Sequence, residues 1–169
     1  MSSSITSTET KIDKQDFIKE LLNDFRVMCL SREASLLGRK EVLTGKAKFG
    51  IFGDGKELPQ IVMAKFFRNG DIRSGYYRDQ TFMMATNNLT IKEFFAGLYA
   101  HTDIQKEPTS AGRQMGGHFS TRLIDENGKW LNLTEQKNST SDISPTAGQM
   151  PRLVGLGLAS KVYRNNKEL

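Results

Sequence analysis

Apolar residues recur at spacings of three and four along the first part of the chain, a pattern typical of helices that bury one face. From Asp16 to about Leu37 they predict one long amphipathic helix, with an apolar face of Phe17, Leu21, Leu22, Phe25, Met28 and Cys29. The spacing returns within residues 56–67 and predicts a second helix, which tolerates Pro59 in its first turn and has a face of Leu58, Ile61, Val62, Lys65 and Phe66. A third helix is expected within residues 88–101, capped by Thr90 or a neighbour.

The pattern is weaker elsewhere. Residues 68–87 are rich in turn-forming residues and leave room for one short turn or helix. Residues 102–148 show little periodicity, and a loop of that length is usually functional or disordered. Residues 144–166 predict a turn and then a final helix, with Pro151 in its first turn and the small residues Gly155, Gly157, Ala159 and Ser160 along it.

Composition limits the class of protein. With 169 residues, 37% of them hydrophobic, the chain has room for one packed domain, which we place at residues 16–169, after a disordered lead-in of residues 1–15. The net charge of +5 fits a phosphorylated ligand or a partner surface without demanding nucleic acid. The single cysteine, Cys29, excludes an internal disulfide framework and favours the cytoplasm, and no apolar run reaches the ~18 residues of a membrane span.

The stretch GYYRDQ carries the first candidate chemistry, because a guanidinium such as that of Arg78 can bind a phosphate through paired hydrogen bonds. The alternative interpretation is that Tyr76 and Tyr77 are core or interface aromatics and that Arg78 forms a surface ion pair.

The stretch SAGRQMGGHFSTR carries the second candidate chemistry. Gly116 and Gly117 permit unusual backbone conformations before His118, which lies close to Arg113 and Arg122 in the sequence. A cationic, flexible loop of this kind suits an anionic substrate such as a carboxylate. The alternative is a histidine with a purely structural hydrogen bond.

Several familiar catalytic devices are missing from the sequence. His101 and His118 are not grouped with carboxylates at metal-ligand spacing, and no Gly-x-Ser-x-Gly or Walker motif occurs. The residues alone therefore indicate an anion-binding domain with a functional loop. A non-catalytic module that binds anions or nucleic acid is the alternative, with Tyr76 and Tyr77 as the base-stacking aromatics.

Four motifs, read in order, carry a resemblance that extends from about residue 16 to residue 169: KFGIFGDGKELPQIVMA, GYYRDQTF, SAGRQMGGHFSTR and SDISPTAGQMPRLVGLGLASK. Together they resemble the N-terminal part of the alpha subunit of thiamine diphosphate-dependent 2-oxo acid dehydrogenases. The GRQM stretch before His118 is more similar to the branched-chain (2-oxoisovalerate) enzymes than to the pyruvate enzymes. The resemblance implies an α/β fold, namely the helix-rich N-terminal portion of a thiamine diphosphate-binding fold, in which helices flank a parallel sheet.

The resemblance also assigns cofactor contacts to matching positions. Tyr77 and Arg78 would contact the cofactor diphosphate. Ser144 and Thr146 would contact the cofactor near its aminopyrimidine and diphosphate, and would hold it in a bent conformation.

The resemblance assigns a catalytic role to His118, which would bind the substrate carboxylate or stabilise the charge that grows on the 2-oxo oxygen. Arg113 and Gln114 would shape the substrate entrance. The family often binds potassium under the Ser-Pro turn through a threonine, and this chain has Gly148 at that position, so potassium binding stays open.

The implied function is oxidative decarboxylation of a 2-oxo acid and acyl transfer to a lipoyl domain, as in branched-chain amino acid catabolism. The implied partners are a beta subunit or beta region, a lipoyl-bearing acyltransferase component and a small-molecule 2-oxo acid, in a hetero-oligomer or fused dimer, without nucleic acid or membrane. The family's magnesium motif would lie beyond Leu169, so its ligands would be outside this chain, and we expect the chain alone to be inactive. We also expect residues 102–142 to be disordered without cofactor and partner.

Gly53-Asp54-Gly55, followed after 31 residues by Asn87-Asn88, matches that magnesium motif in residue types and spacing. The intervening GYYRDQ lies well upstream of the metal site in the family, and the true motif stands on strands. We therefore expect Asp54 to be a turn or cap residue with no metal on it.

Overall fold

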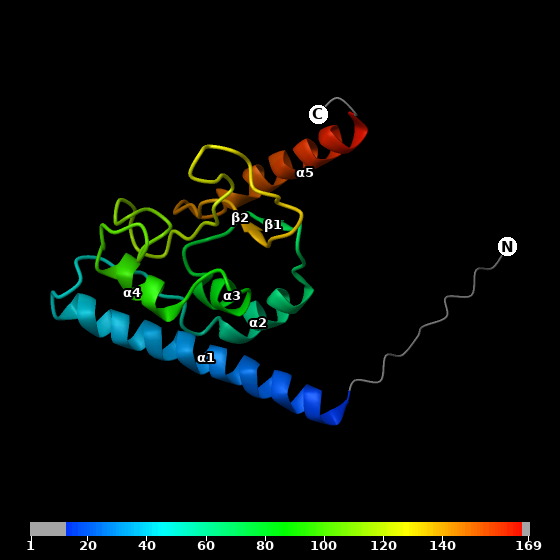
Figure 1. Ribbon diagram of the computed structural model, residues 1–169. Helices are drawn as coiled ribbons and strands as arrows, with labels where there is room; N and C mark the ends of the chain where they lie inside the picture. The colour runs from blue at the N-terminus through cyan, green and yellow to red at the C-terminus, as the bar shows by residue number, and fades with distance from the viewer. Residues whose placement is uncertain (1–12, 167–169) are drawn as a thin grey trace.

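The computed structural model describes residues 13–166 (Figure 1). Its elements in chain order are α1 (Lys14–Leu43), α2 (Glu57–Phe66), β1 (Ile72–Arg73), α3 (Gln80–Ala85), α4 (Ile91–Leu98), β2 (Asn138–Ser139) and α5 (Gln149–Asn165). Helix α1 lies along one side of the molecule, the short helices lie on it, and the strands lie between these helices and α5. The two strands pair in parallel, with Ile72 opposite Asn138 and Arg73 opposite Ser139. Helices with a small parallel sheet are compatible with the expected α/β class.

Helix α1 is longer at both ends than its sequence pattern indicated. It begins at Lys14, because the Asp13 carboxylate accepts the N–H of the residue two positions later and caps the helix. It ends at Leu43, beyond the expected end. Residues 13–15, which we assigned to a disordered lead-in, are therefore the cap and first turn of a helix, whereas residues 1–12 lie outside the described residues.

The face that α1 buries is not the predicted apolar face. The buried residues are small or polar, namely Ser31, Ala34, Ser35, Gly38 and Glu41, whereas Phe17, Leu21, Leu22 and Phe25 are each 53–63% exposed. The cause is the polar first turn of α3, which packs on α1. The Ser31 and Thr81 hydroxyls share a hydrogen bond of 2.7 Å, and the Gln80 amide donates to the Ser35 hydroxyl at 2.9 Å. These buried polar groups satisfy one another, so no apolar face is needed there.

Helix α2 departs from its predicted face in a similar way. It buries Glu57, Gln60, Ile61 and Ala64, and of these only Ile61 belongs to the predicted face. Leu58, Val62 and Phe66 are exposed, and Lys65 forms an ion pair with Asp24 of α1 at 2.6 Å.

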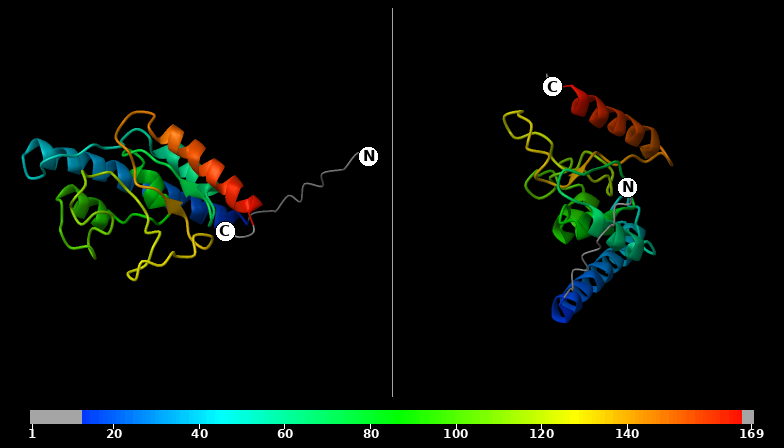
Figure 2. Two further views of the ribbon diagram at one scale, coloured as in Figure 1. Left: turned by 90° about the horizontal axis from the view of Figure 1, so that it is seen from above. Right: turned by 90° about the vertical axis from the view of Figure 1, so that its right-hand side faces the viewer.

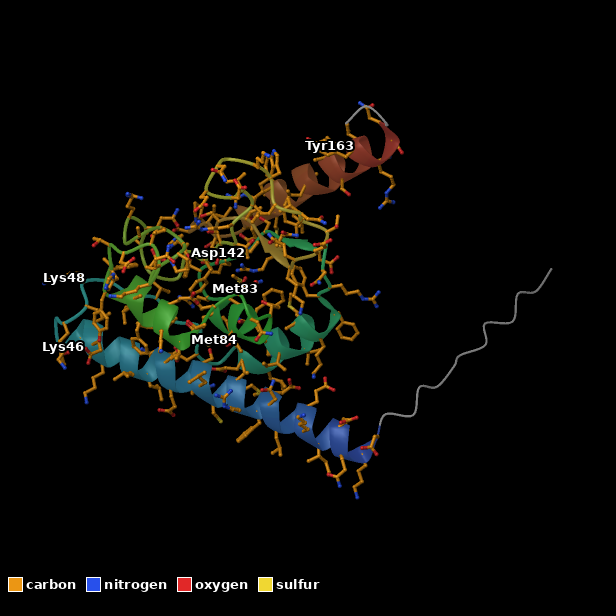
Figure 3. The ribbon with its side chains drawn as sticks, viewed as in Figure 1. Lys46, Lys48, Met83, Met84, Asp142 and Tyr163 are labelled. Atoms are coloured by element: carbon orange, nitrogen blue, oxygen red, sulfur yellow. The ribbon has the colours of Figure 1, made fainter. Side chains whose placement is uncertain are left out.

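The hydrophobic core lies where α3 meets α1, α2 and α4. Met83 is fully buried, and Figure 3 shows Met83 and Met84 in the middle of the molecule. The other buried members of the core are Ala34, Ala64, Phe82, Leu89, Phe94 and Phe119. Phe119 comes from the long irregular stretch after α4, so the core anchors that stretch to the helices.

The structure describes all of residues 102–142, for which we expected disorder without ligand and partner, and β2 lies within them. The Glu107 carboxylate organises part of this stretch by accepting the backbone N–H groups of Thr109, Ser110 and Gly112. Before it, Thr90 caps α4, as the sequence suggested, and it forms a capping box with Glu93.

Helix α5 stands apart from the other helices, on the side of the molecule opposite α1 (Figures 1 and 2). None of its residues is buried, and it exposes the apolar side chains of Met150, Leu153, Val154, Leu158, Val162 and Tyr163. Among the described residues, no helix combines the length and the hydrophobicity needed to cross a bilayer.

Candidate functional site

Two of the predicted motifs follow the two strands and lie side by side. Residues 76–79 come after β1 and residues 142–146 come after β2. Tyr76 pairs with Ile143 in an isolated parallel bridge, which continues the pairing of the strands. The carboxyl ends of parallel strands are the edge of α/β sheets where ligands commonly bind.

A third segment, residues 115–119, lies against the first. Gly117 has a φ of +89°, and a Cβ at this position would fall 2.8 Å from the Tyr77 carbonyl oxygen. Both facts require glycine, so the residue before His118 has a steric role. We refer to residues 76–79, 115–119 and 142–146 as the three site segments.

The first site segment presents an arginine among aromatic rings. The Tyr76 and Tyr77 ring centroids are 4.0 Å apart, their hydroxyls share a hydrogen bond of 2.6 Å, and the Arg78 guanidinium carbon lies 5.6 Å from the Tyr77 ring centroid. The Gln60 amide of α2 donates to the Arg78 carbonyl at 3.0 Å and fixes the backbone. The Arg78 Nε is buried and has no hydrogen-bond partner among the described residues. An anionic ligand would supply that partner.

Arg78 also lines an open cavity of about 430 Å³, together with Arg39 and Asp54. Arg39 donates to the Asp54 carboxylate at 2.6 Å, and this hydrogen bond lowers the pKa of Asp54. The Asp54 carboxylate is thus paired with an arginine, in a turn before α2. Among residues 13–166, no three side chains of histidine, cysteine, aspartate or glutamate gather to hold a metal ion.

The imidazole of His118 is held from both sides. Its Nδ1 lies 2.9 Å from the Met115 carbonyl oxygen, and its Nε2 is hydrogen-bonded to the Ser144 hydroxyl. Because a carbonyl only accepts, Nδ1 carries the proton, and in the neutral ring Nε2 accepts from Ser144. The ring centroid lies 6.0 Å from that of Tyr77, so this histidine joins all three site segments.

The remaining predicted residues differ in how they contact the three site segments. Hydrogen bonds to Tyr77 and to Thr146 lower the pKa of Tyr76, which places the Thr146 side chain beside Tyr76. Gln114 lines a small pocket of about 40 Å³ with His118. Arg113 is exposed and is not among the residues that line this pocket.

Sequence reasoning missed the buried charges beneath the site. Arg73 and Asp142 form an ion pair at 2.8 Å, and the Arg73 side chain is only 8% exposed. Both residues lie in stretches of weak periodicity, where no sequence signal marks them as buried.

One of the comparisons with known proteins agrees with the motifs. No protein-family model matches the chain. The chain is similar to the 2-oxoisovalerate dehydrogenase subunit alpha of Bacillus subtilis (strain 168), with 29% identity over 154 residues, which is 88% of this chain. It spans 40% of the length of that relative. This similarity confirms the resemblance to the alpha subunit of a 2-oxo acid dehydrogenase that the motifs indicated.

Proposed function

We propose that residues 16–169 are the N-terminal part of a thiamine diphosphate-binding domain in the decarboxylating component of a branched-chain 2-oxo acid dehydrogenase. The similarity to the Bacillus subtilis relative supports the enzyme class. The observation that carries the site is the unpartnered, buried Nε of Arg78, which lies in the same cluster of site segments as His118 and Ser144.

Arg78 has the chemistry required to hold a diphosphate. A guanidinium binds two phosphate oxygens at once, and the Arg78 guanidinium lies beside the Tyr77 ring. The neighbouring cavity of about 430 Å³ has a second guanidinium, that of Arg39, in its lining. Thr146 would contact the same cofactor from the third site segment. The bound cofactor would supply the nucleophilic carbon and the electron sink for decarboxylation.

His118 would orient the 2-oxo acid. With Nδ1–H committed to the Met115 carbonyl, a second proton on Nε2 gives an imidazolium that can donate to the substrate carboxylate or to the 2-oxo oxygen. Ser144 holds Nε2 in place until the substrate arrives. Gln114 would shape the entrance through the pocket that it shares with His118, and Arg113 would attract the anionic substrate from the surface.

The proposal extends to partners. The apolar side chains exposed on α1 and α5 suit contact with a beta subunit or beta region, and the acyl product would pass to a lipoyl-bearing component. Magnesium would be held by residues outside this chain, and the assembly would work in the cytoplasm.

The test is Arg78→Ala in the complete gene product, assembled with its partners. Loss of a charge-assisted contact to phosphate should raise the thiamine diphosphate concentration at half-saturation at least tenfold, which corresponds to ~1.4 kcal/mol. Arg68→Ala removes an exposed arginine elsewhere and should change nothing. Equal half-saturation in the parent and the Arg78 variant would overturn the assignment.

A further inference from the structure

One buried cation lies beneath the three site segments. The Arg73 guanidinium pairs with Asp142 at 2.8 Å and with Asp79 at 2.9 Å, and it donates to the Ser139 hydroxyl at 2.6 Å. We call these four residues the Arg73 cluster. Figure 3 places Asp142 deep in the molecule near Met83, whose sulfur lies 3.2 Å from the same guanidinium.

Each carboxylate of the Arg73 cluster also holds backbone of the site. Asp79 accepts the Tyr76 N–H at 3.0 Å and closes the turn of the first site segment. Asp142 begins the third segment and accepts the N–H of Phe119, the last residue of the second segment, at 3.3 Å. The Asp142 N–H donates in return to the Phe119 carbonyl at 3.0 Å. One guanidinium is therefore connected to all three site segments.

We propose that Arg73 and Asp142 are positioning residues, which set the spacing of the three site segments and so the relative positions of Arg78 and His118. This inference rests on the function proposed above for the latter two residues. Arg73 and Asp142 do not line the cavity that Arg78 lines, so the proposed role is exerted through the backbone and not by contact with a ligand in that cavity.

The free-energy cost of burying these charges indicates that the role of the Arg73 cluster is to fix backbone positions. The Asp142 side chain has no exposed surface, and burial raises its pKa to about 7 although Arg73 opposes the effect. Removing two charges from water costs more than a pair usually returns, and apolar residues of similar volume are often equally stable in such places. Apolar residues, however, cannot make the hydrogen bonds that fix backbone spacing. The chain also keeps Gly75 where a Cβ would fall 1.8 Å from the Arg73 guanidinium.

The test replaces both charges together, by Arg73→Met with Asp142→Leu, in the complete gene product assembled with its partners. Three quantities are measured: the midpoint of urea denaturation, the hydrogen exchange of peptides that cover the three site segments, and the thiamine diphosphate concentration at half-saturation by calorimetry. The control is Lys65→Met with Glu20→Leu and Asp24→Asn, which removes the two ion pairs that Lys65 makes between α2 and α1.

The expected result is a denaturation midpoint that is unchanged or raised, exchange at least tenfold faster in the three segments, and half-saturation raised at least fivefold, with no change in the control. Unchanged exchange and affinity would overturn the inference. So would a lowered midpoint with faster exchange throughout α3 and α4, because that is the behaviour of a purely structural pair. If the double variant does not fold, Asp142→Asn is judged by the same criteria.

Arg78→Ala separates the two proposals. If that variant binds the cofactor normally, the proposed function fails, and the exchange data on the Arg73 cluster still decide whether it couples the segments. If Arg78→Ala loses affinity and the cluster variants do not, only the positioning role fails.

Discussion

Glu57 provides a quantitative test of how the turn before α2 is held. Its carboxylate accepts hydrogen bonds from Nε and Nη2 of Arg32, at 2.7 and 2.8 Å, and from the Gly55 N–H at 3.0 Å. Glu57 is only 5% exposed. The hydrogen bonds from Arg32 lower the pKa of Glu57 to about 2, against the opposing effect of burial. The same helix holds Arg78 through Gln60, so this ion pair supports the site as well as the fold.

The size of the effect follows from the pKa. A carboxyl group whose pKa is lowered on folding stabilises the folded chain above its unfolded pKa, near 4.5, and this stabilisation is lost as the pH falls towards 2. A pKa lowered by ~2.5, at ~1.4 kcal/mol for each pH unit, gives ~3.5 kcal/mol as an upper value. Because the Arg32 side chain is 48% exposed, solvent screens the pair, and we expect ~2 kcal/mol.

Glu57→Gln should therefore lower the free energy of unfolding by ~2 kcal/mol near neutral pH, and the difference from the parent chain should fall below half of that by about pH 3. Urea denaturation followed by far-ultraviolet circular dichroism measures both values. The control is Asp54→Asn, which breaks a more exposed pair with Arg39 and should cost less than ~0.5 kcal/mol. A difference that does not change with pH, or one as small as the control's, would refute the reasoning.

Three further predictions concern the site. His118→Ala should abolish turnover of the assembled enzyme while thiamine diphosphate still binds, so wild-type turnover would contradict its proposed role. Gly117→Ala should lower the free energy of unfolding by about 1–3 kcal/mol more than Gly128→Ala does. Both glycines have a positive φ, but only at Gly117 would a Cβ lie against the Tyr77 carbonyl. Equal losses of stability in urea denaturation would argue against this close approach. Burial raises the pKa of Asp142 from 3.8 to about 7, so between these two values the folded chain holds a proton on this carboxyl that the unfolded chain releases. This group's contribution to stability should therefore fall as the pH rises from about 4 to about 7, and the ion pair with Arg73 is complete only above that range. Asp142→Leu should flatten that slope, and an unchanged slope would assign it to another group.

The sequence was sufficient to locate α1, α2, α4 and α5, but not α3, nor to say which face of α1 and of α2 is buried. Periodicity from Asp16 to about Leu37 indicated a long helix, which the structure extends at both ends, yet Phe17 and Leu21 are exposed and Ser31 and Ser35 are buried. Periodicity reports that a face exists, whereas burial depends on the neighbouring helix. The polar first turn of α3, which determines this contact, has no periodic signal of its own.

The candidate site was likewise predicted only in part. The residues alone marked Arg78 and His118 as candidates, the family resemblance added Ser144, and the structure brings their segments together. Their supporting charges could not be predicted, because strands of two residues are too short to show an alternating pattern. In such a stretch the sequence does not distinguish a buried arginine–aspartate pair from an exposed one.

Gly53 illustrates why a residue that is conserved among related sequences need not indicate a conserved activity. A Cβ at this position would fall 2.3 Å from the Arg78 carbonyl oxygen, so any side chain would displace the backbone that carries the arginine. A related protein that did not use the proposed cofactor, but still had to fold, would be under selection to keep this glycine. Conservation of Gly53 among related proteins would therefore reflect the packing of two backbones. The proposed activity would have to be judged from Arg78 and His118.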